Sequence, residues 1–178
     1  GLSGENEIFL LSLLNNIPKS LPTLIDADGL KLLNRINRWW AHLPCQTVLT
    51  PHPGEMSVLT GLDIHEIQSN RWDIAQKFAQ EWGVTLVLKG AVTVIAGSQG
   101  DLFINPTSDS SLATAGSGDI LSGMIGGLMA GGMGAVEAAA VGTWLHAQAG
   151  LIARTALGSG TSVTALDILD ALPDAFRP

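Results

Sequence analysis

Short apolar segments alternate with amphipathic helical patterns along most of this chain. Residues 23–25, 47–50 and 84–88 are apolar or β-branched runs with the length of a buried strand, and residues 71–82 have the spacing of a helix. Parallel strands need long crossover connections, usually helices, whereas antiparallel strands need only short turns. The alternation therefore predicts an α/β architecture, with a central, mostly parallel sheet flanked by helices.

The carboxyl-terminal half adds one exception to this pattern. The turns at 89–90 and 97–101 are too short for crossovers, so residues 92–96 and the "GDLFINP" segment predict an antiparallel hairpin edge. Further helices are expected over residues 7–17, 118–132, 135–157 and 164–172, with one more capped by Asp28 and another that opens near Glu55. The 178 residues contain no linker or clear repeat, and we expect residues 1–178 to form a single α/β domain.

Composition excludes several classes of protein. Nine Lys and Arg against sixteen Asp and Glu give a net charge of −7, which argues against nucleic-acid binding through a basic surface. The apolar run between Asp119 and Arg154 is broken by "GGMG" at 131–134, and each half is short of the ~20 residues that a membrane helix needs. A single cysteine, Cys45, excludes an intrachain disulfide. We therefore expect a cytoplasmic protein that neither spans membranes nor binds nucleic acid.

The segment "TAGSGDILSG", residues 114–123, joins a polar loop to a glycine-dotted helical pattern. Gly116, Ser117 and Gly118 would leave free backbone N–H groups at the start of a helix, which suits a phosphate. Asp119 is either a cap or first-turn acid of that helix, or a base that takes a proton from a hydroxyl being phosphorylated. The local residues leave these two interpretations evenly balanced. The segment is not a Walker A loop, because no Gly-Lys-Ser/Thr follows.

Polar residues also follow the predicted strands. Asp26, His52 with Glu55, and Lys89 each come just after one of them. Ligands of open α/β sheets bind beyond the carboxyl ends of the strands, so this shared placement predicts a site. Each residue also has a plain structural explanation, as part of a turn, as a first-turn acid or as a solvated lysine. We interpret His146 as a surface or core histidine.

Glycines recur every four residues behind the GSGD segment, at positions 123, 127 and 131. A glycine inside a helix costs about 1 kcal/mol relative to alanine, so the stripe needs a reason. We interpret it as a bare helix face that allows close packing against a neighbour.

Four blocks together resemble the NAD(P)H-hydrate dehydratases of the ribokinase-like superfamily. They are "DADGLKLL" (26–33), "TPHPGE" (50–55), "LKGAVTVI" (88–95) and "TAGSGDILSG" (114–123), in family order and spread over essentially the whole chain. "HPGE" is the more specific block, because sugar and vitamin kinases of the superfamily usually carry Pro-Asn-x-x-Glu there. The resemblance implies a ribokinase-like fold whose amino-terminal part is missing here, so that the chain is expected to be the carboxyl-terminal portion of a longer dehydratase domain.

The resemblance also implies an activity. Family members repair NADH or NADPH whose nicotinamide ring has been hydrated, using ADP or ATP as co-substrate and Mg²⁺. Phosphorylation of the ring hydroxyl makes a good leaving group, and its elimination restores NAD(P)H, with ADP giving AMP. The family implies a homo-oligomer and a fused or separate NAD(P)H-hydrate epimerase. A ribokinase-like small-molecule kinase, for a vitamin precursor or a sugar, is the alternative enzyme, and a nucleotide-binding or structural remnant is the non-enzymatic one.

Site residues are carried over from the family by their positions in the four blocks. Asp119 would be the catalytic base and would contact the hydrate, together with Gly4, His52 and Glu55. Glu55 would also help to order Mg²⁺ through water. The residues implied to bind the nucleotide are Lys89, Gly90, Ala91, Val92, Thr93, Gly116, Ser117 and Gly118. The loop before Gly116 has "SDSS" at 108–111 where the family often shows Gly-Asn-Pro-Gly.

Overall fold

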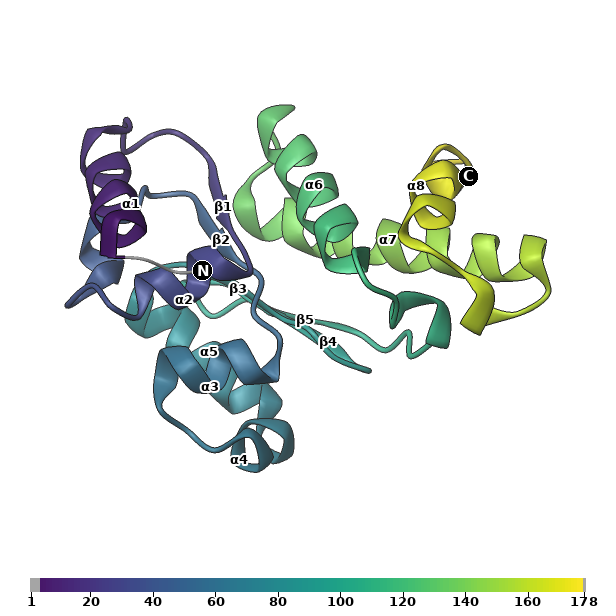
Figure 1. The fold of residues 1–178 in the computed structure, drawn as a ribbon, viewed down its shortest axis with the longest axis horizontal. Helices are drawn as coiled ribbons and strands as arrows, with labels where there is room; N and C mark the ends of the chain where they lie inside the picture. Colours follow the sequence, from purple (N-terminus) through teal and green to yellow (C-terminus); the bar gives the residue numbers. More distant parts are fainter. Residues whose placement is uncertain (1–3, 178) are drawn as a thin grey trace.

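A computed structural model describes residues 4–177 and shows a five-stranded sheet between layers of helices (Figure 1). The spatial order of the strands is β1 (Thr23–Ile25), β2 (Thr47–Leu49), β3 (Thr85–Leu88), β4 (Thr93–Ala96) and β5 (Leu102–Asn105). β1, β2 and β3 are parallel neighbours, whereas β3, β4 and β5 pair antiparallel. The predicted α/β class and the antiparallel hairpin edge are confirmed.

The helices fall close to the ranges that the apolar periodicity predicts. They are α1 (Gly4–Asn16), α2 (Asp28–Leu33), α3 (Pro53–Thr60), α4 (Ile64–Ser69), α5 (Arg71–Trp82), α6 (Ser117–Ala130), α7 (Ala135–Leu157) and α8 (Ala165–Ala175). α4 was not predicted, because its six residues are too few to show a helical period. Within residues 4–177, no helix is both long and apolar enough to cross a bilayer.

The core has two halves, one on each face of the sheet. Along β3 the side chains alternate, so that Leu86 and Leu88 pack with the cluster of α1 to α5, and Val87 packs with α6 and α7. A third cluster joins α7 to α8. Both faces of β3 are therefore buried, which explains why its sequence is a run of apolar and β-branched residues.

The glycines of α6 do not play the part predicted for them. A Cβ built at Gly123 or Gly127 would meet nothing within 4 Å, so the prediction of close packing is wrong for the part of the chain that the structure describes. The close approach of α6 and α7 depends on Gly142 of α7. A Cβ at that position would lie 2.8 Å from Cγ1 of Ile125. Both helices carry glycines at short intervals, and the sequence pattern alone did not distinguish the packed glycine from the open ones.

Candidate active site

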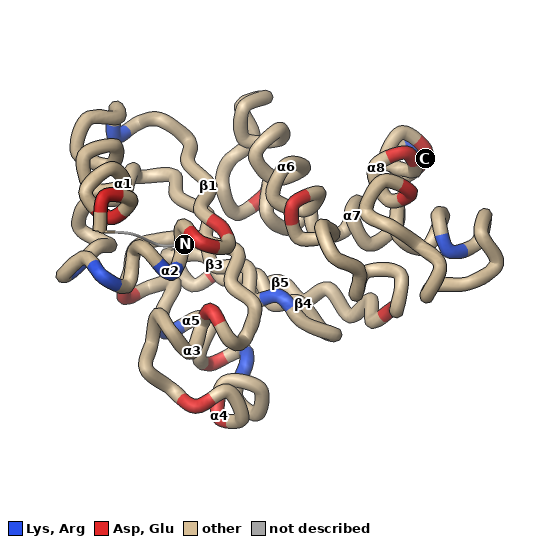
Figure 2. Tube along the Cα trace, viewed as in Figure 1, with Lys and Arg blue, Asp and Glu red and all other residues tan. Residues whose placement is uncertain are grey.

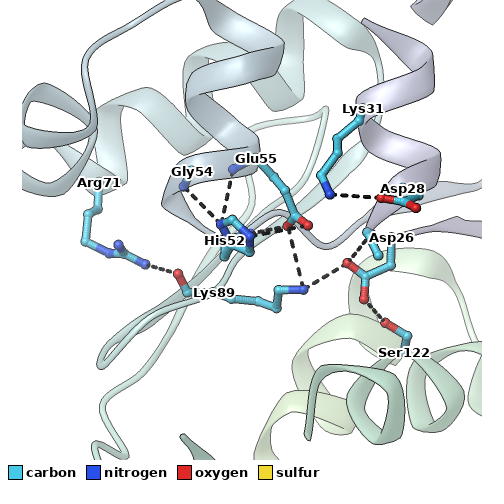
Figure 3. A network of polar contacts seen from close by, with 10 residues as sticks. Asp26, Asp28, Lys31, His52, Gly54, Glu55, Arg71, Lys89 and Ser122 are labelled. Atoms are coloured by element: carbon cyan, nitrogen blue, oxygen red, sulfur yellow. Dashed lines mark hydrogen bonds and ion pairs between the residues drawn. The ribbon is translucent and has the colours of Figure 1, made fainter. Parts of the chain in front are cut away.

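A lysine lies between two carboxylates at the carboxyl ends of β1, β2 and β3 (Figure 3). The Lys89 ammonium is 2.8 Å from Asp26 Oδ1 and 4.0 Å from Glu55 Oε2. Ser122 of α6 donates to Asp26 Oδ2 over 2.7 Å, so Asp26 links the sheet edge to the helix. The predicted convergence of strand-end residues is present in the structure, and it also includes a serine that the sequence did not single out.

The charge state of Asp26 follows from these contacts. Burial raises the pKa of its carboxyl group, but the hydrogen bonds from Lys89 and Ser122 and the charge of Lys89 outweigh burial and hold the pKa below its ordinary value of 3.8. The adjacent Ala27 has a φ of 51°, an uncommon conformation for a residue with a Cβ, and its amide also donates to Asp26. The carboxylate is thus charged at neutral pH and fixed in position.

Arg71, at the start of α5, holds the turn that carries Lys89. Its guanidinium is buried and donates to the carbonyl oxygens of Leu88 and Lys89 over 2.8 and 3.1 Å. A Cβ on Gly90 would lie only 2.7 Å from Nη2 of Arg71, so a side chain there would displace the guanidinium. Sequence reasoning missed Arg71, because a charged residue at the start of a helix gives no sign of a contact 17 positions away.

His52 and Glu55 form a capping box at the start of α3. The Nδ1 atom of His52 accepts from the backbone N–H groups of Gly54 and Glu55, and the Glu55 carboxylate accepts from the His52 amide over 2.9 Å. The structural explanation for both residues is therefore correct. It does not exclude a second role, because His52 also lines a large cavity and Glu55 faces Lys89.

The GSGD segment begins α6 as predicted. Gly116 takes a φ of 84° as the residue before the helix, and Ser117 is its first residue. The amides of Ser117 and Asp119 donate to nearby carbonyl oxygens, whereas the Gly118 amide donates to no group within residues 4–177. A Cβ at Gly118 would lie 3.5 Å from the Lys89 ammonium. The Lys89 ammonium therefore lies close to the start of α6, whose free N–H group favours an anion, although Asp26 Oδ2 would lie 4.0 Å from the same Cβ.

A cavity of about 770 Å³ opens beside this point. Among the residues predicted for the site, it is lined by His52, Lys89, Gly90, Ala91, Thr93, Ser117 and Gly118. Asp109 and Leu112, from the loop before α6, and His146 of α7 form other parts of its wall. Its volume is in the range typical of small-molecule sites.

The remaining predicted residues lie outside this cavity. Asp119 is an exposed first-turn residue of α6 and faces a smaller hollow of about 400 Å³ between α6 and α8. Gly4 is the first residue of α1. Neither the cavity nor the smaller hollow is lined by Gly4, Val92 or Gly116. Ser117 and Asp119 thus line different hollows, although only Gly118 stands between them at the start of α6.

Charge is sparse around the cavity. Figure 2 shows the acidic and basic positions scattered over the chain, with long uncharged stretches in α6 and α7. Between Asp119 and Arg154 the only charged residue is Glu137. The potential at the cavity wall is therefore set by a few groups, and near Gly118 the positive ones are Lys89 and the start of α6.

Comparison with known proteins adds a family to this geometry. The NAD(P)H-hydrate dehydratase family matches residues 1–174. The bifunctional NAD(P)H-hydrate repair enzyme of Moorella thermoacetica is 45% identical over 157 residues, which cover 88% of this chain and 29% of that protein. The ADP-dependent (S)-NAD(P)H-hydrate dehydratase of Neisseria meningitidis is 36% identical over 84% of this chain and 51% of its own length. The chain thus spans about half or less of these relatives.

Solved structures agree with the sequence comparison. The ADP/ATP-dependent NAD(P)H-hydrate dehydratase of Bacillus subtilis, co-crystallized with ATP and Mg²⁺, matches with a TM-score of 0.78 and 32% identity over 88% of this chain and 55% of that one. A ribokinase-like superfamily protein of Enterococcus faecalis matches over 100% of this chain and 61% of that one, with a TM-score of 0.78 and 24% identity, and supports the fold alone. The chain belongs to the NAD(P)H-hydrate dehydratase family, whose ribokinase-like fold it shares.

Proposed function

We propose that this site takes part in the nucleotide-dependent dehydration of hydrated NADH or NADPH. The observation that carries the proposal is the closeness of the Lys89 ammonium to Gly118, whose amide is free within residues 4–177, on the wall of the large cavity. Such a pair suits the terminal phosphate of an adenine nucleotide. Membership of the family favours this reaction over the phosphorylation of a vitamin precursor or a sugar.

The chemistry begins at the ring hydroxyl of the hydrate. This oxygen attacks the terminal phosphorus of ADP, its proton passes to a base, and AMP leaves. The ring nitrogen then uses its lone pair to break the carbon–oxygen bond and expel phosphate. Loss of a proton from the adjacent ring carbon restores the double bond of NAD(P)H. The sum is one hydrate and one ADP converted to NAD(P)H, AMP and phosphate, and ATP would give ADP and phosphate.

In this proposal each residue has a defined task. Lys89 and Gly118 bind the transferred phosphate, and Ser117 adds a hydroxyl next to them. Asp119 takes the proton of the substrate hydroxyl, since its carboxylate is one residue beyond Gly118 and forms no side-chain hydrogen bond or ion pair within residues 4–177. His52, on the cavity wall, contacts the hydrate.

Mg²⁺ fits this site through water. The ion usually retains several waters and takes one or two protein carboxylates together with substrate phosphates. Within residues 4–177 no group of three or more acidic, histidine or cysteine side chains gathers to form a protein cage, but Glu55 offers a buried carboxylate near Lys89. Bound there, the ion would neutralise phosphate charge, with Glu55 orienting its water.

Four further expectations accompany this proposal. We expect the described residues to act as one α/β unit, the protein to be cytoplasmic and the assembly to be a homo-oligomer. We also expect an NAD(P)H-hydrate epimerase as a fused or separate partner. The Moorella relative is named as a bifunctional repair enzyme, which supports a second activity in that protein.

The test is recovery of absorbance at 340 nm when hydrated NADH is incubated with the purified protein and ADP or ATP. Asp119→Asn should lower kcat by about a hundredfold or more, because the base is lost, while ADP still binds. Asp73→Asn is the matched control, since Asp73 is an exposed first-turn acid of another helix, α5. No recovery with either nucleotide would contradict the proposal. If kcat falls equally in the two variants, Asp119 is only a first-turn acid of α6 and not the base.

A further inference from the structure

A buried histidine contacts the start of α6 from α7. The His146 side chain is only 6% exposed, and its Nε2 atom lies 3.1 Å from Oγ of Ser117. Both residues line the large cavity. Ser117 is itself buried, so this is a hydrogen bond inside the wall and not a surface contact. The proposed reaction gives His146 no task.

The protonation state of His146 limits what this hydrogen bond can be. Burial lowers the pKa of His146 to about 4, and a weaker interaction with the Ser117 backbone acts in the opposite direction. At neutral pH the ring is therefore neutral and carries one proton, on either Nδ1 or Nε2.

The two tautomers leave Ser117 in different states. A serine hydroxyl has one proton to donate. If Nε2 is bare, it accepts that proton, and the hydroxyl has none left for a ligand. If Nε2 carries the ring proton, it donates to Oγ, and the hydroxyl proton is free to turn into the cavity. Only the second arrangement adds a donor next to the Gly118 amide and the Lys89 ammonium.

We propose that His146 is a positioning residue for nucleotide binding, whose Nε2–H group donates to Ser117 so that the serine hydroxyl donates to the terminal phosphate. The inference rests on the proposed nucleotide site. His146 would act on nucleotide binding only by orienting Oγ of Ser117, without contacting the phosphate itself.

A double-mutant cycle measures this dependence. The readout is the Kd for ADP with Mg²⁺, from calorimetry, for the unsubstituted chain, Ser117→Ala, His146→Leu and the double variant. Ser117→Ala should weaken binding about tenfold or more, because a hydrogen bond to a charged phosphate is lost. His146→Leu should weaken it about threefold to tenfold, and should have no further effect in the Ser117→Ala background. Additive losses would overturn the inference.

Conservative variants test the same point independently of packing. His146→Gln can place an amide N–H near the position of Nε2 and should recover most of the ADP affinity, whereas His146→Asn, whose amide corresponds to Nδ1, should not. Leu145→Ala is the structural control, because Leu145 is buried in the same helix but does not line the cavity. It should lower the melting temperature and leave the Kd for ADP unchanged. Equal effects of Gln and Asn would contradict the assigned geometry.

The tautomer itself can be observed by nitrogen-15 NMR of the histidine rings. The inference predicts a protonated Nε2 and a bare Nδ1 for His146 at neutral pH, both without and with ADP. A protonated Nδ1 with ADP bound would overturn it and leave the proposed function intact. Absence of ADP binding by the unsubstituted chain would contradict the nucleotide site, and this inference with it.

Discussion

At the scale of single residues, Asp26 holds the candidate site together through its hydrogen bonds. It accepts from Lys89, from Ser122 of α6 and from the amide of Ala27. Its side chain is 13% exposed, so these hydrogen bonds replace most of the water that the carboxylate would otherwise bind. If the charge of Asp26 is removed, Glu55 remains as the other acidic partner of Lys89 within residues 4–177, at 4.0 Å.

Asp26→Asn should therefore change how stability depends on pH. A carboxyl group with a lowered pKa in the folded state stabilises that state above its unfolded pKa, and this contribution is lost as the pH falls through the folded value. At pH 7 the variant should lose about 1 to 3 kcal/mol in the free energy of unfolding. The difference from the unsubstituted protein should shrink below the ordinary pKa of 3.8.

Urea unfolding between pH 3 and pH 8 measures this effect, with Asp73→Asn as the control for an exposed acid. A difference between Asp26→Asn and the unsubstituted protein that stays constant over this range would contradict the ionised, hydrogen-bonded state of Asp26.

Residues at strand ends could be predicted from the sequence, and their partners inside helices could not. Asp26, Glu55 and Lys89 meet because the carboxyl ends of parallel strands share one edge of the sheet. Ser122 contacts Asp26 across 96 positions of sequence, and His146 contacts Ser117 across 29. Neither helix interior carries a local pattern that reveals these contacts. They follow from how α6 and α7 pack, which periodicity alone does not fix.

At the scale of elements, the loop before α6 is held against the carboxyl-terminal helices. Arg154 of α7 forms an ion pair with Asp109, which is 7% exposed at its side chain. A Cβ at Gly150 of α7 would lie 2.5 Å from Leu112, so the loop touches the helix backbone closely. Asp109 and Leu112 both line the large cavity. The position of this wall thus depends on contacts made outside the cavity.

Arg154→Gln should loosen this wall with little loss of global stability. The ion pair is partly exposed, and such pairs contribute little to stability, so the melting temperature should hardly change. Amide hydrogen exchange in residues 107–112 should become faster, and ADP should bind about twofold to fivefold more weakly. Arg177→Gln, which removes an exposed ion pair at the carboxyl end of α8, is the control. Unchanged exchange in residues 107–112 would show that the ion pair does not hold the loop.

The order and type of the main elements could be predicted because their apolar spacings are long or clear. β3 reads as a fully buried strand, and α5 and α7 extend over twelve and twenty-three residues. The role of the α6 glycines could not be predicted, because a glycine-lined helix face has the same sequence whether or not a neighbouring helix packs against it. In the described structure Gly123 and Gly127 line the hollow beneath Asp119.

At the scale of the whole molecule, the sheet and the two helical layers bring four segments to one place. The segments after β1, β2 and β3 contribute Asp26, Glu55 and Lys89, and α6 adds Ser122 (Figure 3). The amino terminus of α6 also lies close to Lys89. Polar groups far apart in sequence therefore meet at the carboxyl ends of the strands, beyond the buried faces of the sheet. This arrangement agrees with membership of the NAD(P)H-hydrate dehydratase family.

The proposed dehydration proceeds through a phosphate ester of the ring hydroxyl. Hydrated NADH prepared in oxygen-18 water carries the label in that hydroxyl, and the reaction is then run with ADP in ordinary water. Mass spectrometry of the released phosphate gives the fate of the label. Each phosphate should carry one oxygen-18 atom, with one AMP and one NADH formed per phosphate. Unlabelled phosphate, with the oxygen-18 released as water, would contradict it.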